Sequence, residues 1–145
     1  MVVIQNSIKD ASIDEQNLTN ILQKVIVDLG KGDSELLIRL VDKNEIQDLN
    51  NTYRGKNQPT NVLSFPSDLP VEIEEAILGD VVICIEVVRE ESKAQGKTFE
   101  HHLTHMAIHG VLHLLGYDHI ENGEAETMEN LEVRILDGLG INNPY

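Results

Sequence analysis

The chain has 145 residues, which fits one domain, and its 41% hydrophobic and 25% charged residues are those of an ordinary soluble globular protein. No apolar run approaches the roughly 18 residues of a membrane span, and the single cysteine, Cys84, excludes an internal disulfide. The formal net charge of −14 would normally repel nucleic acid. The first residues lack the features of a signal peptide, so we expect residues 1–145 to form one cytoplasmic domain.

The first half of the chain predicts two strands and two helices. Residues 2–8 and 36–41 have the pattern of strands. Ser12 and Glu15 form a capping box, which predicts that a helix begins there and is ended by Gly30 and Gly32. Asp42 and Glu45 form a second capping box that opens a short helix to about residue 53. The first helix has one apolar face, made of Leu18, Ile21, Leu22, Val25, Ile26 and Leu29.

The second half predicts two more strands and three helices. After a loop at 54–59, residues 61–65 form a strand that Pro66 ends, and an acidic loop with Pro70 follows. Residues 79–85 are nearly all apolar and predict a central strand. Helices are expected at 86–95, 99–115 and 123–138, with Thr98 as the cap of the second. The order fits an α/β or α+β class, and we predict an α+β domain with one mixed sheet of about four strands and about five helices.

Charge is unevenly distributed along the chain. Residues 49–67 contain neither Asp nor Glu, and their only charged side chains are Arg54 and Lys56. One interpretation is a turn and strand that happen to lack acids. The other is a landing site for an anionic ligand on a surface that otherwise repels it.

The six histidines are the main functional signal, because all lie between residues 101 and 119. His109 and His113 are four residues apart in an apolar helical pattern, so both rings share one helix face, about 6 Å apart along the axis. His119 would point away on a continuous helix, but Gly116 predicts a turn that brings it back. Three neutral imidazoles leave a coordination position for water, which is the pattern of catalytic zinc. The remaining three are interpreted as ordinary polar or core residues, with His105 in a supporting position: His101, His102 and His105.

The spacing His-x-x-x-His-x-x-Gly-x-x-His is that of the metzincin proteases, with one difference. Those enzymes carry a Glu after the first His as general base, and Gly110 stands there in this chain. This difference argues against a peptidase. We expect Gly110 to clear space beside the metal for a bulkier electrophile.

Three segments together resemble the YbeY family of bacterial endoribonucleases. They are His-Gly-Val-Leu-His-Leu-Leu-Gly-Tyr-Asp-His at 109–119, Tyr-Arg-Gly-Lys-Asn-Gln-Pro-Thr-Asn-Val-Leu-Ser-Phe-Pro at 53–66, and Leu-Gly-Asp-Val-Val-Ile at 78–83. The resemblance implies a zincin-like fold, a metal held by three histidines and usually taken as zinc, and cleavage of single-stranded RNA. It also implies a role in 16S rRNA 3′ end maturation and ribosome quality control, with the small ribosomal subunit and its proteins as partners. Arg54 matches the arginine that is functionally important in the family.

These observations lead to one mechanism and two alternatives. We expect one Zn²⁺ per chain on His109, His113 and His119, although imidazoles also suit nickel or another divalent ion. Arg54 is the predicted catalytic residue, because its guanidinium suits a phosphate, and Lys56 and Ser64 are further predicted substrate contacts. The alternatives are a metal-dependent peptidase with a substituted base and a non-catalytic ribosome-assembly factor with a structural metal. We expect neither a membrane nor DNA as a partner.

Two residues of the turn after the helix have open roles. Tyr117 either stacks on a base or packs the turn, of which packing is favoured. Asp118 either orients a ligand histidine or serves the turn itself.

Overall fold

The computed structural model describes residues 1–67, 77–117 and 122–145 of the chain. Its centre is a four-stranded sheet in the order β1-β2-β4-β3. The pairs β1–β2 and β2–β4 are parallel, whereas β3 is antiparallel to β4. The predicted mixed sheet is therefore confirmed. The strands are β1 (Val2–Asn6), β2 (Glu35–Val41), β3 (Val62–Pro66) and β4 (Ile77–Cys84).

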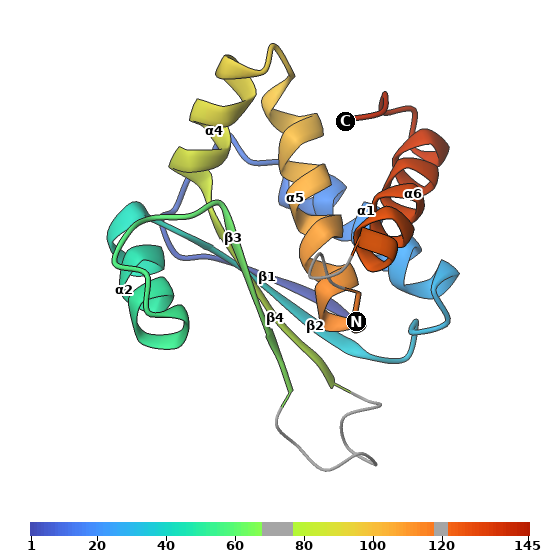
Figure 1. Ribbon diagram of the computed structural model, residues 1–145, viewed down its shortest axis with the longest axis horizontal. Coiled ribbons are helices and arrows are strands. Elements are labelled where there is room, and N and C mark those ends of the chain that lie inside the picture. Colours follow the sequence, from blue (N-terminus) through green and yellow to red (C-terminus); the bar gives the residue numbers. More distant parts are fainter. Residues whose placement is uncertain (68–76, 118–121) are drawn as a thin grey trace.

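Five helices in the described part of the chain pack around this sheet, so the predicted α+β class is also confirmed (Figure 1). None of these helices is both long and apolar enough to cross a membrane. The expected acidic loop around Pro70 lies outside the described residues. The helices are α1 (Glu15–Asp28), α2 (Lys43–Arg54), α4 (Ile85–Ala94), α5 (Phe99–Leu114) and α6 (Asn122–Gly138).

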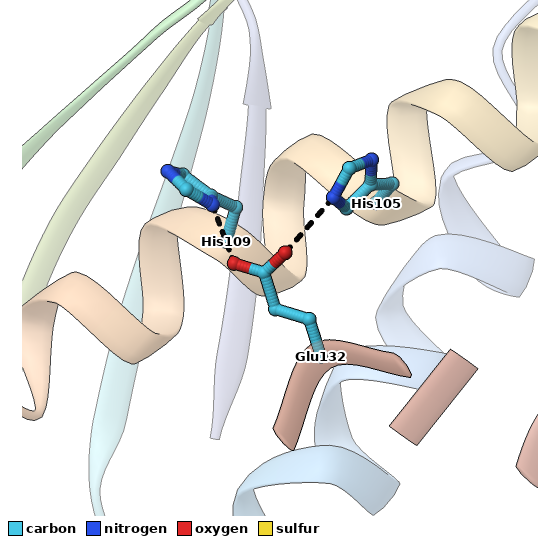
Figure 2. Close-up of side chains that lie close together, drawn as sticks. All are labelled: His105, His109 and Glu132. Carbon is cyan, nitrogen blue, oxygen red and sulfur yellow. Dashed lines mark hydrogen bonds and ion pairs between the residues drawn. The ribbon is translucent and has the colours of Figure 1, made fainter. Parts of the chain in front are cut away.

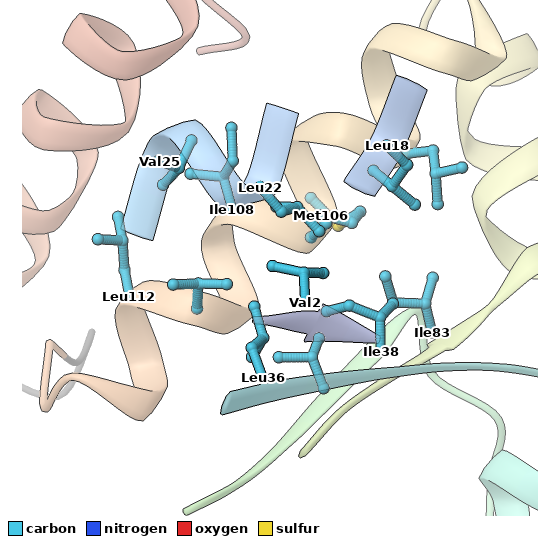
Figure 3. Packing of buried hydrophobic residues seen from close by; sticks show 14 of the residues in the cluster. Val2, Leu18, Leu22, Val25, Leu36, Ile38, Ile83, Met106, Ile108 and Leu112 are labelled. Atoms are coloured by element: carbon cyan, nitrogen blue, oxygen red, sulfur yellow. The ribbon is translucent and has the colours of Figure 1, made fainter. Parts of the chain in front are cut away.

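The sheet has a helix layer on each face, because alternate residues of its strands point to opposite sides. Ile38 and Ile83 point into the main core with α1, α5 and α6, which Figure 3 shows at close range. Val82 and Cys84 point the other way, into a smaller cluster under α2. β4 is buried on both faces, which explains its continuous apolar run, and the thiol of Cys84 is buried at its end.

Helix starts agree with the capping predictions in two of three cases. Asp42 accepts a hydrogen bond from the Glu45 amide at 2.9 Å, and Thr98 accepts one from the His101 amide at 3.2 Å. The predicted cap of α1 is wrong, because Asp14 rather than Ser12 accepts from the Asn17 amide. The Ser12 hydroxyl instead bonds to the carboxylate of Asp10, which the loop before α1 brings beside it.

Candidate active site

A cleft lined by polar and basic side chains lies between β3, the end of α2 and α5. Its volume is about 620 Å³. The acid-free stretch 49–67 forms most of its wall, and none of the described residues that line it is acidic. The stretch faces the two central histidines of the sequence motif, as a landing site for an anionic ligand beside them would require. The lining residues are Tyr53, Arg54, Thr60, Asn61, Val62, Leu63, Ser64, Phe65, His109 and His113.

Arg54 reaches this cleft because α2 ends at that residue. Gly55 follows with φ +68°, a left-handed conformation that glycine adopts without strain, and it closes the helix. The Arg54 side chain is exposed at the rim of the cleft. Lys56, two residues further along the chain, is exposed but does not line the cleft. Of the two predicted basic contacts, only Arg54 is therefore part of the cleft wall.

His109 and His113 converge as their four-residue spacing predicts. Their ring centroids are 4.6 Å apart with an interplanar angle of 78°, and their Nε2 atoms face each other at 3.0 Å. Two nitrogens bound to one tetrahedral zinc ion at about 2.05 Å would be roughly 3.3 Å apart. The pair therefore has the spacing that a shared metal ion needs.

The third predicted ligand, His119, and its neighbour Asp118 lie outside the described residues. The described residues before them agree with the predicted turn. Helix α5 ends at Leu114, and Gly116 adopts φ +97°. This left-handed conformation stops the chain from continuing along the axis of α5.

A buried glutamate on α6 lies between His105 and His109 and contacts both (Figure 2). Glu132 has no solvent exposure, and its carboxylate accepts hydrogen bonds from His109 Nδ1 at 2.5 Å, from His105 Nε2 at 3.0 Å and from the Tyr145 hydroxyl. Burial raises the pKa of Glu132, but these three hydrogen bonds outweigh it and lower the pKa to about 2. Glu132 is therefore a carboxylate at neutral pH and acts as an acceptor.

This contact sets the tautomer of His109. A carboxylate can only accept, so Nδ1 of His109 carries the proton and its Nε2 presents a lone pair toward His113. A carboxylate behind a histidine is the usual support of a metal-binding imidazole. His105 Nε2, His109 and Glu132 also offer ligand atoms within 4.8 Å of one another, so these described residues form a group that could itself hold a metal ion.

The other two histidines of α5 face away from the cleft. His101 is exposed in the first turn of the helix. His102 is buried, and its Nε2 pairs with Glu91 of α4 at 3.0 Å. The same carboxylate accepts from the Asn61 amide group at 3.2 Å, so this network supports the start of β3 from behind.

Gly110 has a different role from the one expected. A Cβ on Gly110 would lie 2.5 Å from a methyl carbon of Val81 on β4, so the missing side chain lets α5 approach the sheet. The expectation that Gly110 clears space beside a metal is wrong, because buried Val81 occupies that space. Ser64 lines the cleft, and its hydroxyl donates to the Gly110 carbonyl at 2.8 Å. Tyr117 packs against the main core and does not line the cleft, in agreement with the favoured packing role.

The sequence interpretation missed three residues of this site. Glu132 carried a signal, because it lies four residues from both Met128 and Leu136 and so shares the buried face of α6. Tyr53 carried a weaker signal, its place beside Arg54 in the acid-free stretch. Tyr145 carried no signal, because only the folded tail brings its hydroxyl to Glu132.

Comparison with known proteins agrees with this geometry. A family model described as Endoribonuclease YbeY matches residues 3–140. Proteins named Endoribonuclease YbeY from Vesicomyosocius okutanii subsp. Calyptogena okutanii (strain HA) and Ruthia magnifica subsp. Calyptogena magnifica are 63% and 64% identical, each over all of both chains. The solution structure of TM1509 from Thermotoga maritima is 30% identical, with a TM-score of 0.64, and the match covers 97% of this chain and 92% of that chain.

Proposed function

Because the chain belongs to the YbeY family of endoribonucleases, we propose that it is a metal-dependent endoribonuclease that cleaves single-stranded RNA in the cleft between α2, β3 and α5. One observation carries the proposal. The converging histidines and Arg54 line a single cleft whose described walls contain no carboxylate to repel a phosphodiester. The expected substrate is ribosomal RNA, chiefly the 3′ end of 16S rRNA, with a further role in ribosome quality control.

His109, His113 and His119 would hold the metal, with zinc as the expected ion and nickel as an alternative. The facing Nε2 atoms of the first two residues support this ligand set, and Glu132 would support His109 from behind. We prefer it to the His105, His109 and Glu132 group because His105 and Glu132 do not line the cleft. When bound, the metal would activate a water or a ribose hydroxyl and polarise a phosphoryl oxygen.

The residues of the cleft wall would bind the substrate. The Arg54 guanidinium would clamp a phosphate and stabilise the extra charge of the transition state. Tyr53, which packs edge to face on Phe65 at 5.0 Å and is 66% exposed, would stack on a base. Ser64 would add a polar contact, although its hydroxyl proton is already directed to the Gly110 carbonyl. Lys56 would attract the RNA backbone from outside the cleft.

The remaining parts of the proposal concern the cellular setting. We propose that residues 1–145 act as one domain in the cytoplasm, with the small ribosomal subunit as the partner that presents the RNA. Binding of the intact subunit, compared with binding of free RNA of the same sequence, would test this arrangement.

The test of function combines metal analysis with an RNA cleavage assay. His113→Ala should lose both the metal and cleavage, whereas His101→Ala, its exposed match on the same helix, should keep both. Arg54→Ala should keep the metal and lose most single-turnover cleavage, and Arg54→Lys should recover little, because a point charge does not form a bidentate contact. Arg134→Ala, an exposed arginine of α6, is the matched control.

Three outcomes would contradict the proposal. Cleavage of casein but not of single-stranded RNA would indicate a peptidase. Wild-type cleavage by His113→Ala would remove the metal from the mechanism. Ribosome binding without RNA cleavage by any metal-loaded form would indicate an assembly factor with a structural metal.

A further inference from the structure

The last seven residues run from the end of α6 back toward α5 (Figure 1). Backbone and side-chain contacts hold them there. The Ile141 amide donates to the Leu136 carbonyl at 2.9 Å, and Lys97 Nζ donates to the Pro144 carbonyl at 3.2 Å. The Tyr145 amide donates to Asn143 Oδ1 at 2.8 Å. The first two of these bonds anchor this tail, residues 139–145, to α6 and to Lys97, and the third lies within the tail.

The Tyr145 side chain reaches the carboxylate behind the histidine pair. Its ring packs edge to face on the His105 ring, with centroids 5.6 Å apart and an interplanar angle of 89°. Its hydroxyl donates to Glu132 Oε2. Burial and the neighbouring carboxylate raise the pKa of Tyr145, so the phenol keeps its proton and is the donor of this bond.

The hydrogen bonds divide the two oxygens of Glu132 between two tasks. Oε1 faces His109 Nδ1, whereas Oε2 accepts from both His105 Nε2 and Tyr145. Two donors on Oε2 fix the rotation of the carboxylate group, and this rotation decides whether Oε1 points at His109. The Tyr145 hydroxyl thus touches neither the cleft nor the facing Nε2 atoms, but it acts on the residue that orients one of them.

From this arrangement we propose that Tyr145 is a positioning residue of the metal site, whose hydroxyl orients Glu132 and through it His109, so that the tail raises the affinity of the cleft for a divalent metal ion. The inference rests on the proposed function, because it takes His109 as a metal ligand. Partners of metal-binding histidines typically affect metal affinity by 10- to 100-fold. Tyr145 lies one step further out, so its loss should weaken metal binding by about 10-fold.

The experiment compares Zn²⁺ affinity in four proteins, measured by competition with a chelating dye at neutral pH. Tyr145→Phe keeps the ring on His105 and removes only the hydroxyl, so it should bind Zn²⁺ about 10-fold more weakly than wild type. Lys97→Met is the matched control, because it removes an anchor of the tail but leaves the hydroxyl, and it should bind within about twofold of wild type. His113→Ala should bind too weakly to measure in the same assay.

The outcomes separate the two proposals. If His113→Ala loses Zn²⁺ but Tyr145→Phe binds like wild type, the positioning role is wrong while the metal site stands. If His113→Ala binds like wild type, the ligand assignment fails and the inference fails with it. If Lys97→Met is weakened as much as Tyr145→Phe, the tail acts through general docking rather than through its hydroxyl, which also overturns the inference.

Nuclear magnetic resonance of the metal-free protein gives a second readout that docking alone would not change. In wild type the His109 ring should be protonated at Nδ1, where Glu132 accepts the proton. In Tyr145→Phe the Nδ1 proton signal should broaden, and the ring nitrogens should show a mixture of tautomers. Lys97→Met should keep the wild-type signal, and an unchanged spectrum for Tyr145→Phe would contradict the proposal.

Discussion

Replacing Gly110 with alanine sets two effects of known size against each other. Alanine is better than glycine in a helix interior by about 1 kcal/mol, which favours the variant. The added Cβ would lie 2.5 Å from a methyl carbon of Val81 and 3.1 Å from Ser64 Oγ. Overpacking of a tight core costs about 1–3 kcal/mol, and because Val81 has no solvent exposure and therefore little room to move, we take the upper part of this range, about 2–3 kcal/mol. We expect a net loss of about 1–2 kcal/mol in the free energy of unfolding.

Thermal unfolding followed by circular dichroism measures this loss. A change of 1 kcal/mol shifts Tm by about 2–4 °C at this chain length, so Tm should fall by about 2–8 °C. Gly138→Ala is the matched control, because a Cβ there meets no atom within 4 Å, and Tm should stay the same or rise slightly. Adding Val81→Ala to Gly110→Ala should remove most of the penalty in a double-mutant cycle. A rise in Tm for Gly110→Ala alone would refute the packing argument.

Three further predictions concern the pH dependence of stability, the pH dependence of metal content and the role of Ser64 in the cleft. Hydrogen bonds from Ser12 and Arg89 lower the pKa of Asp10 to about 2, so Asp10→Asn should be less stable than wild type at pH 7. Urea titrations should show this difference in the free energy of unfolding disappearing as the pH falls from about 4 to 2. Metal content, measured after equilibrium dialysis, should fall as the pH drops below about 6, because histidine ligands must lose their protons to bind a metal and free histidine titrates near roughly 6.5. Full metal content at about pH 4.5 would argue against a three-histidine site. Ser64→Ala should lower the free energy of unfolding by about 1 kcal/mol, because the Gly110 carbonyl loses a hydrogen-bond donor. A large fall in the rate of RNA cleavage by variant protein that is still fully folded would show that Ser64 contacts the substrate directly.

The fold was predictable where local signals decide it. Helical periodicity over Leu18 to Ile26 and the caps at Asp42 and Thr98 depend on neighbours in sequence, and the structure confirms them. The cap of α1 failed because Ser12 and Asp14 are both good cap residues, and the choice depends on Asp10 and Arg89, which lies 77 residues from Ser12. A prediction based on neighbouring residues in the sequence does not include the contact between Arg89 and Ser12.

The candidate site shows the same division. Spacing alone brought His109 and His113 together, because a helix places residues four apart on one face. Glu132 is 23 residues from His109, and its role depends on how α6 packs on α5, which no local pattern specifies. Its one trace in the sequence is an acid in the buried register of α6. Because a buried charge needs hydrogen-bond partners, an acid at such a position predicts a polar network, although the sequence does not identify the partner residues.

The net charge of −14 does not prevent binding of an RNA substrate, because repulsion from acids far from the cleft is screened, whereas contacts inside the cleft act at short range. At physiological ionic strength, charges more than about 8 Å apart in water are largely screened, so acids on distant faces repel RNA only weakly. Within the cleft the described lining carries no acid, and the Glu132 carboxylate behind it is surrounded by donors from His105, His109 and Tyr145. The acid that supports the histidines is thus separated from the cleft by the imidazole it orients. The cleft therefore offers an RNA strand the Arg54 guanidinium, which is exposed at its rim, while the acids on distant faces add little repulsion.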